Sequence, residues 1–422
     1  MTNPLKSHHR QYYEALDAVD ALAFARQRFS LPANKIYLDG NSLGALPVAT
    51  MDAIAASISR DWGEDLIGAW NKADWINLPA TVGAKLAPLL GAGANEVIIA
   101  DSTSINIFKL LAGVLMLPDI ANNSERNIII SERDNFPTDL YMIEGVNALL
   151  GHRYTLKLVD ADELTSAINH QTAAVLITQV NYRTGRILDM AALNLAAHAC
   201  GAHIVWDLSH SAGAIPLQLN CDDAEFAVGC GYKYLNGGPG APGYLYVASK
   251  YQTLLSTPLS GWFGHKTPFL FSVSYLPADN MQRFLCGTPS VLATLALLVG
   301  IETFDGVNLQ AVRAKSLALT DLFLDLMDEH CVDAGVDCVS PRQHACRGSQ
   351  LSFSHDDAHA VMQALIDRGV VGDFRAPNLI RFGFTPLYTR YVDCFDAVMV
   401  LKEVLQSGVW CEQQYQTRNR VT

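Results

Sequence analysis

Four residues between positions 207 and 233 have side chains that cofactor chemistry uses. Asp207 and His210 lie in one short run, and Tyr232 and Lys233 follow in a Gly-rich stretch. Asp207 ends an apolar run, at the strand end where open α/β sheets place their ligands. A carboxylate there can hold a pyridinium nitrogen protonated, and a lysine in an uncharged surrounding is easily deprotonated for a Schiff base. The order and types of these residues indicate pyridoxal 5'-phosphate (PLP) chemistry.

Tyr232 could simply be a buried aromatic residue with a satisfied hydroxyl, and the other three residues also have plain structural explanations. Asp207 could cap the turn that follows it, His210 could be a buried histidine with satisfied hydrogen bonds, and Lys233 could be an ordinary loop lysine beside glycines. Their joint placement, on a strand end and in a Gly-rich loop, favours the cofactor hypothesis over three separate coincidences.

Apolar, β-rich runs alternate with helical patterns and predict the elements that position these residues. This alternation is typical of an α/β fold with a mostly parallel sheet covered on both faces. The predicted strands are 96–100, 127–131, 174–178, 203–207 and 243–247, with a further apolar run at 226–230.

The pattern divides the chain into an arm and two domains. Residues 1–50 form an N-terminal arm that we assign to the small domain, 50–290 form the large PLP-binding domain, and 291–422 form a small α+β domain. The arm is rich in glycine and turn residues around positions 36–47, so we expect it to cross the surface toward the site.

Three further segments carry side chains suited to holding a cofactor. The run that begins at Asp101 follows a strand and opens a helix, where hydroxyls and N–H groups bind an anion such as phosphate, although it could equally serve as a helix cap. Phe136 offers a ring for stacking, or simple loop packing. Thr178 ends a strand and could reach the cofactor or only fill the strand.

Two arginines in the small domain are candidates for binding a substrate carboxylate. Arg375 and Arg381 could grip it in a bidentate manner, and Arg381 is favoured because an arginine on an apolar strand needs a partner. Both could instead form structural ion pairs. Trp262 and Thr288 lie on turn-rich segments that could reach across a subunit interface, or they could be core or turn residues.

The composition excludes several classes of partner. The formal net charge is −12 and no basic stripe is present, which argues against nucleic-acid and anionic-membrane partners. The nine cysteines are scattered without a CxxC pair, which is typical of reduced thiols in the cytosol. The first residues contain no apolar signal core and no apolar stretch is long enough to span a bilayer. We therefore expect a soluble, cytoplasmic protein.

These motifs together resemble those of the kynureninases of the bacterial type. The resemblance is carried, in order along nearly the whole chain, by Tyr37-Leu-Asp-Gly-Asn-Ser-Leu-Gly44, Asp101-Ser-Thr-Ser-Ile-Asn106, Phe136-Pro-Thr-Asp139, Asp207-Leu-Ser-His210, Tyr232-Lys-Tyr-Leu-Asn-Gly-Gly-Pro-Gly240 and Arg381-Phe-Gly-Phe-Thr-Pro-Leu-Tyr388. The lysine loop occurs throughout the fold-type I PLP enzymes, whereas the first and last of these motifs are far more specific.

The resemblance implies the PLP-dependent transferase fold (fold type I) of the aspartate aminotransferase superfamily, with a mostly parallel seven-stranded sheet, a small α+β domain and a homodimer. It implies Lys233 as the Schiff-base lysine, Asp207 as the pyridinium partner and Tyr232 as a proton donor. The implied cofactor shell is completed by Thr103, Ser104, Phe136, Asp139, Thr178 and His210, with Trp262 and Thr288 from the partner subunit, and the implied substrate contacts are Arg381, Arg375, Asn41 and Ser42.

The implied reaction is hydrolysis of a carbon–carbon bond of L-kynurenine to give anthranilate and L-alanine, a step of the kynurenine pathway of tryptophan catabolism and NAD biosynthesis. Thr288 stands where kynureninases that prefer 3-hydroxykynurenine have asparagine, which favours the unsubstituted substrate. Two alternatives stay open. A cysteine desulfurase or selenocysteine lyase would need a mobile nucleophilic cysteine, for which Cys346 is the nearest candidate, and a PLP-fold binding protein would hold the cofactor without turnover.

Overall fold

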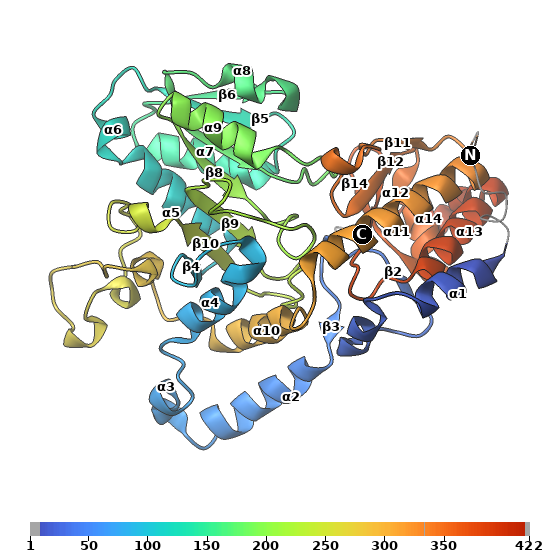
Figure 1. Cartoon of the computed structure of the whole chain (residues 1–422), viewed down its shortest axis with the longest axis horizontal. Helices are drawn as coiled ribbons and strands as arrows, with labels where there is room; N and C mark the ends of the chain where they lie inside the picture. The colour runs from blue at the N-terminus through green and yellow to red at the C-terminus, as the bar shows by residue number, and fades with distance from the viewer. Residues whose placement is uncertain (1–8, 333, 418–422) are drawn as a thin grey trace.

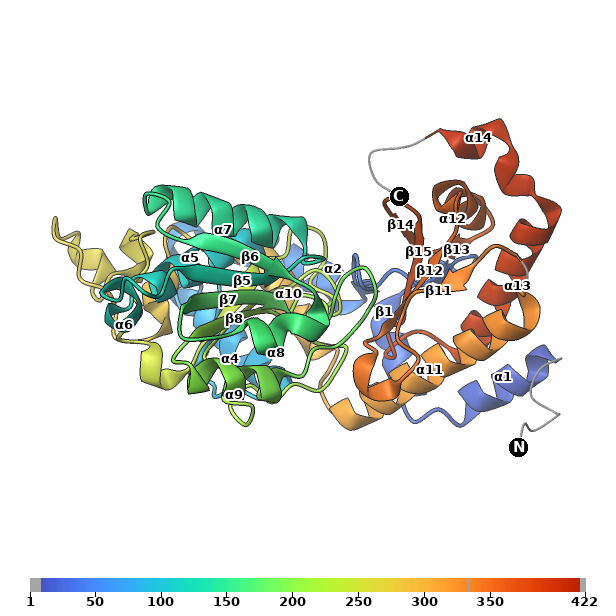
Figure 2. The same ribbon diagram turned by 90° about the horizontal axis from the view of Figure 1, so that it is seen from above.

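A computed structural model describes residues 9–332 and 334–417, which form two lobes side by side (Figure 2). Residues 1–8, on which the prediction about a signal core rests, lie outside the described residues. In the described part, no helix is long and apolar enough to cross a membrane.

The larger lobe is built on a seven-stranded sheet. The strands from β9 to β6 run parallel to their neighbours, whereas β10 is antiparallel to both β9 and β4. The mostly parallel sheet is therefore confirmed, with one reversed strand. Across the sheet the order is β4 (Val97–Ile99), β10 (Gly243–Val247), β9 (Phe226–Cys230), β8 (His203–Asp207), β7 (Thr172–Thr178), β5 (Ile128–Glu132) and β6 (Thr155–Val159).

Helices cover both faces of this sheet, which explains why its central strands are apolar throughout (Figure 2). One face is covered by α5 (Thr103–Leu115) and α7 (Pro137–Leu149), and the other by α4 (Leu78–Leu90) and α9 (Met190–Ala199). Asp189 caps α9 by accepting a hydrogen bond from the backbone N–H of Ala192. Shorter helices on this lobe are α3 (Ala69–Lys72), α6 (Pro118–Ala121) and α8 (Leu164–Ala167).

Two helices, α2 (Ala49–Ala56) and α10 (Val291–Glu302), lie outside these layers, where the chain passes between the two lobes. The helix α2, which continues as a π-helix over Ser57–Trp62, extends along the lower edge of the molecule (Figure 1). The helix α10 packs against α2 and α4 and leads into the long α11 (Leu309–His330), with which the second lobe begins. The division near residues 50 and 290 stays a prediction.

The smaller lobe packs helices against a four-stranded sheet. Its order is β11 (Asp337–Cys338), β12 (Gln350–Ser354), β15 (Leu379–Gly383) and β14 (Asp373–Arg375). The helices are α1 (Arg10–Ala18), α11, α12 (Ala358–Asp367), α13 (Tyr391–Ser407) and α14 (Gln413–Gln416). Aromatic rings of Phe323, Phe353 and Phe382 meet in the core between α11 and the sheet.

The N-terminal arm is more deeply buried than predicted. Its strand β2 (Ile36–Tyr37) pairs with β13 (Val370–Val371), while β1 (Phe29–Ser30) pairs with β3 (Leu46–Pro47). Leu38 and Asn41 are fully buried, so the expectation that this segment runs over the surface is wrong there. The reason is that the arm packs into the small lobe: β2 pairs with β13, and Leu38 accepts a hydrogen bond from the backbone of Gly383 at the end of β15.

Candidate active site

Asp207 ends β8 with its carboxylate buried at 4 % exposure. Its Oδ1 accepts hydrogen bonds from the backbone N–H and the hydroxyl of Ser209, at 2.8 and 2.6 Å. Burial raises the pKa of Asp207, while the Ser209 hydrogen bonds and the charge of Lys233 oppose the rise. Among the described residues, Ser209 alone donates to this carboxylate and no lysine or arginine pairs with it, although buried carboxylates normally have such a partner. A cation supplied by a ligand would be that partner.

Lys233 lies on the turn after β9 and points toward the same place. Its Nζ lies 3.0 Å from Nε2 of His210 and 5.9 Å from the ring centre of Phe136. The N-terminal arm contacts this turn, since the backbone N–H of Gly44 donates to the carbonyl of Tyr232 at 2.8 Å. A side chain at Gly44 would come within 2.5 Å of the Lys233 carbonyl oxygen, which explains why glycine stands there.

One cavity joins nine of the predicted site residues. These are Thr103, Ser104, Phe136, Asp139, Thr178, Asp207, His210, Tyr232 and Lys233. Thr103 and Ser104 open α5, whose N-terminal N–H groups favour an anion. Ser102 caps that helix by accepting from the N–H of Ile105 at 3.4 Å, so capping and a place for an anion occur together at neighbouring residues.

A second buried carboxylate belongs to this cavity. Burial, followed by the negative charge of Asp207, raises the pKa of Asp139 well above 3.8. Thr178 lies 3.5 Å from Asp139 and donates to Asn135 at 2.5 Å. Two buried carboxylates near an aromatic face and a helix N-terminus fit a flat cationic ring with an anionic substituent. PLP has both features, so the residues present fit this cofactor.

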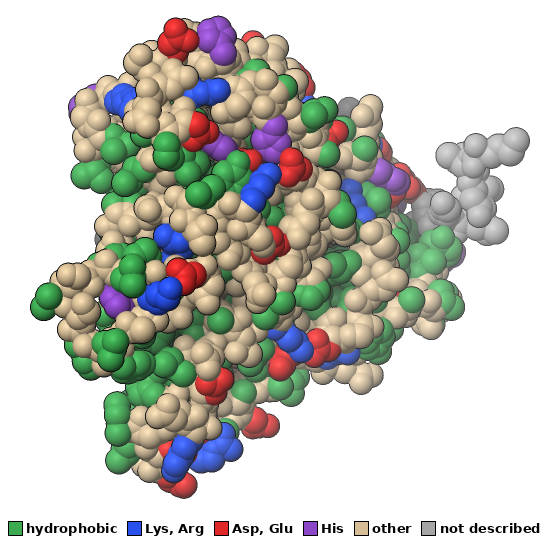
Figure 3. Space-filling view, turned by 60° about the vertical axis from the view of Figure 1, so that its left-hand side comes forward, with side chains coloured by type: hydrophobic (Ala, Val, Ile, Leu, Met, Phe, Trp, Pro, Cys, Tyr) green, Lys and Arg blue, Asp and Glu red, His purple; other side chains and the backbone are tan. Residues whose placement is uncertain are grey.

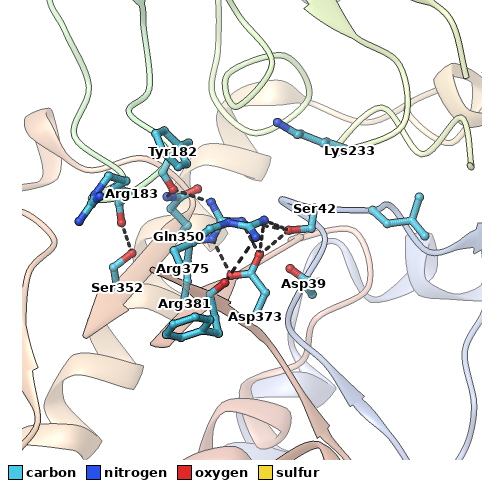
Figure 4. A network of polar contacts seen from close by, with 12 residues as sticks. Asp39, Ser42, Tyr182, Arg183, Lys233, Gln350, Ser352, Asp373, Arg375 and Arg381 are labelled. Atoms are coloured by element: carbon cyan, nitrogen blue, oxygen red, sulfur yellow. Dashed lines mark hydrogen bonds and ion pairs between the residues drawn. The ribbon is translucent and has the colours of Figure 1, made fainter. Parts of the chain in front are cut away.

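The small lobe contributes a buried arginine network beside the cavity (Figure 4). Arg381 on β15 is 1 % exposed and lies directly across the antiparallel ladder from Asp373 on β14. Its Nε donates to Asp373 at 2.8 Å, its Nη2 donates to Asp373 and to Ser42, and its Nη1 donates to the Tyr182 carbonyl. Arg375 also pairs with Asp373, at 2.7 Å. Both arginines are thus in ion pairs, the alternative that the sequence left open.

The protonation of one further acid, Asp39, sets the charge of this network. Burial, followed by the charge of Asp373, raises the pKa of Asp39. The Asp373 carboxyl is also buried, but the positive charge of Arg381 and its hydrogen bonds lower its pKa. With Asp39 neutral, two arginines face one carboxylate, which leaves the network with one positive charge for an anionic substrate group.

Six predicted residues do not line the Lys233 cavity: Arg375, Arg381 and Ser42 belong to the arginine network beside it, and the other three lie elsewhere. Asn41 is fully buried beside Gly383, and no described residue makes a hydrogen bond with its side-chain amide. Thr288 borders a neighbouring cavity of about 490 Å³ that shares only Tyr232 with the first. Trp262 lies on a projecting segment among the exposed rings of Phe269 and Phe271.

Several residues of the site were not singled out from the sequence. They are Asp39, Tyr182, Ser209, Gln350 and Asp373. The sequence did contain a signal for Asp373: a buried arginine requires a partner, and Asp373 lies two residues before Arg375, on the same face of one strand. Gln350 had none, since its contact with His210 joins positions 140 residues apart.

Comparison with known proteins identifies the family. A profile of the kynureninase C-terminal domain matches residues 312–401. Kynureninase from Pseudomonas fluorescens is 48% identical over 409 residues, which is 97% of this chain and 98% of that protein. Kynureninase from Burkholderia mallei is 47% identical over the same share of each chain. This chain belongs to the kynureninase family.

Solved structures support the fold expected for a kynureninase, and nothing more specific. A cysteine desulfurase from Escherichia coli superposes with a TM-score of 0.76 at 20% identity, covering 92% of this chain and 99% of that one. A cystine C–S lyase gives 0.71 at 17%, covering 88% and 97%. Cys346, on which a desulfurase would depend, is not among the residues that line the Lys233 cavity, and its carbonyl accepts from Ile187.

Proposed function

We propose that this kynureninase-family protein binds PLP in the Lys233 cavity and hydrolyses L-kynurenine to anthranilate and L-alanine. The observation that carries the proposal is the convergence of Lys233, His210 and two buried carboxylates on one cavity, next to a buried arginine network. The kynureninase relatives, which match along nearly their whole length, support the choice of substrate.

The residues would divide the work of holding the cofactor. Thr103 and Ser104 would bind the phosphate, Phe136 would stack on the ring, and Asp207 would hold the ring nitrogen protonated. PLP, when bound, supplies an acceptor for the electrons released at the substrate's α-carbon. The Lys233 amine is the group that attaches the cofactor and that afterwards moves the α-proton.

The substrate would be held by its α-carboxylate on Arg381. The Nε and Nη2 edge of that guanidinium is occupied by Asp373 and Ser42, and one N–H of Nη1 by the Tyr182 carbonyl, so the second N–H of Nη1 is the one left for a substrate. Water adds to the γ-carbonyl, the Cβ–Cγ bond breaks, and Cβ takes up a proton. Burial raises the pKa of Tyr232 above 10, which keeps its phenol protonated, and Tyr232 would deliver that proton.

The protein would act as a homodimer. The segment around residues 262–276 projects from the large lobe (Figure 1), and its exposed apolar side chains contribute to the hydrophobic surface in Figure 3. The exposed apolar and aromatic side chains are Trp262, Phe269, Leu270, Phe271, Val273, Tyr275 and Leu276. Patches of this kind mark association surfaces, and they support Trp262 and Thr288 as contributions to the partner's site. Sedimentation of the wild type and of a Leu270→Glu variant tests this, with a monomeric wild type as the contrary result.

Anthranilate fluorescence after mixing the PLP-loaded protein with L-kynurenine tests the proposed reaction. We expect anthranilate and alanine in equal amounts, with the signal lost in Lys233→Ala. Lys250→Ala, which changes an exposed lysine on the same lobe, is the matched control and should retain activity. The proposal fails if the loaded wild type converts neither kynurenine nor 3-hydroxykynurenine, or if Lys233→Ala retains full activity.

A further inference from the structure

The side chain of Gln350 connects the two lobes behind the proposed site. Gln350 begins β12 and is 1 % exposed. Its Nε2 lies 2.9 Å from the carbonyl of Tyr182 and 3.3 Å from that of Asn181, while its Oε1 lies 3.0 Å from Nδ1 of His210. Carbonyl oxygens only accept hydrogen bonds, so the amide nitrogen must face them and the amide oxygen must face His210.

This orientation decides which nitrogen of His210 carries the proton. An amide oxygen is only an acceptor, so Nδ1 must be protonated to make the contact. Burial, with the positive charges of Lys233, Arg381 and Arg375, lowers the pKa of His210 well below 6.5, so the ring is neutral. A neutral ring with its proton on Nδ1 has a free electron pair on Nε2, the atom 3.0 Å from Lys233 Nζ.

We infer that Gln350 is a positioning residue: it fixes His210 in the Nδ1–H form, so that Nε2 accepts a hydrogen bond from Lys233. This inference rests on the proposed function for its catalytic meaning. Lys233 then donates one N–H to His210, which holds its amino group beside the cavity. In the other tautomer, two N–H donors would face each other and the lysine would turn away.

The backbone around Gln350 is built to hold this side chain in place. The N–H of Gly348 donates to the carbonyl of Gly185 at 2.7 Å, and the N–H of Ile187 donates to the carbonyl of Cys346 at 2.9 Å. Gly185 has φ +72° and lies so close that a side chain there would meet Gln350 Cγ at 2.8 Å. The small lobe is therefore hydrogen-bonded to the loop after β7 just before Gln350 reaches across.

The Tyr182 carbonyl, which accepts from Gln350, also accepts a hydrogen bond from Arg381, the arginine proposed to bind substrate. Tyr182 accepts from Gln350 and from Nη1 of Arg381, and these residues lie together in Figure 4. A continuous series of hydrogen bonds thus runs from Arg381 through the Tyr182 carbonyl, Gln350 and His210 to Lys233. Arg381, proposed to bind the substrate carboxylate, and Lys233, proposed to move the proton of the α-carbon, are therefore both linked by hydrogen bonds through Gln350.

Two variants and one control test this role. Gln350→Met keeps the length of the side chain and removes both hydrogen-bonding groups. Gln350→Glu keeps the shape but places a carboxylate beside Nδ1, where it would favour a doubly protonated ring against the surrounding cations. Ser352→Ala is the matched control, because Ser352 lies two residues along the same strand and its hydroxyl donates to Arg183 in the same loop.

The readout is ¹⁵N NMR of the full-length protein labelled in histidine, with PLP and after its removal, and His210→Gln identifies the signal. We expect the neutral Nδ1–H pattern in the wild type and in Ser352→Ala, a mixture of tautomers in Gln350→Met, and a doubly protonated ring in Gln350→Glu. We also expect kcat/KM to fall about tenfold or more in both Gln350 variants.

Two results would overturn the inference: a proton on Nε2 in the wild type, or an unchanged His210 pattern in both Gln350 variants. If one variant does not fold, the other still decides, because each removes the neutral Nδ1–H form in a different way. The NMR pattern is recorded without substrate. A protein that does not convert kynurenine would therefore disprove the proposed reaction and leave the tautomer measurement standing.

Discussion

Removal of the Asp373 carboxylate should strongly destabilise the small lobe. This carboxylate accepts from Nε of Arg381 at 2.8 Å, from Arg375 at 2.7 Å and from the Ser42 hydroxyl at 2.5 Å. The side chains of Asp373 and Arg381 are only 2% and 1% exposed, so neither is screened by solvent. Asp373→Ala would leave two arginine charges facing each other without a carboxylate between them.

The size of the effect follows from the burial. Removing one partner of a buried ion pair costs about 3–5 kcal/mol, because the remaining charge stays desolvated. Asp328 is the matched control: it forms a bidentate pair with Arg342 at 2.7 and 2.6 Å on the same lobe, with side chains 53% and 54% exposed. Exposed pairs of this kind contribute about 1 kcal/mol at most, so Asp328→Ala should change little.

Urea unfolding followed by tryptophan fluorescence measures both variants against the wild type. We expect Asp373→Ala to lower the free energy of unfolding by several kcal/mol more than Asp328→Ala does. We also expect KM for kynurenine to rise in the PLP-loaded Asp373 variant, because the guanidinium of Arg381 loses its fixed edge. Equal losses of stability in the two variants would refute the reasoning that Asp373 balances the buried arginines.

Two further predictions concern the arm. Gly44→Ala would push its Cβ against the Lys233 turn, so we expect weaker PLP retention on dialysis and a lower kcat/KM. Gly145→Ala in α7 is the control, because no atom lies near its Cβ, and it should leave both quantities unchanged. Equal behaviour of the two variants would contradict this prediction. Burial and the charge of Asp373 raise the pKa of Asp39 to about 8 in the folded protein. Between about pH 4 and this value the folded protein therefore holds more protons than the unfolded chain, and the free energy of unfolding falls as the pH rises. Asp39→Asn should remove this slope in urea unfolding measured between about pH 5 and 8, and an unchanged slope would count against a protonated Asp39.

The strands buried on both faces could be predicted well from the sequence. Continuous apolar runs at 203–207, 226–230 and 243–247 coincide with β8, β9 and β10. The direction of β10 was not visible, because composition does not distinguish parallel from antiparallel pairing. The edge strand β6 was missed, since Thr155-Leu-Lys-Leu-Val159 alternates polar and apolar residues and is half-exposed.

Residues at strand ends could also be predicted, whereas their supports could not. Asp207, Thr178 and Lys233 follow from local order along the chain, and one cavity brings them together. Gln350 and Asp39 act through contacts between segments far apart in the sequence. Only the packing of the small lobe against the loop after β7 brings Gln350 to His210, and that packing has no local signature.

The assignment of the Lys233 cavity as the active site can be tested by locating the cofactor on the chain. Borohydride reduction of the PLP-loaded protein fixes the cofactor on the lysine that binds it, and mass spectrometry of tryptic peptides then identifies that residue. We predict a single labelled peptide containing Lys233, with kynurenine turnover lost in proportion to labelling. Label on another lysine, or full turnover after complete labelling of Lys233, would contradict the assignment.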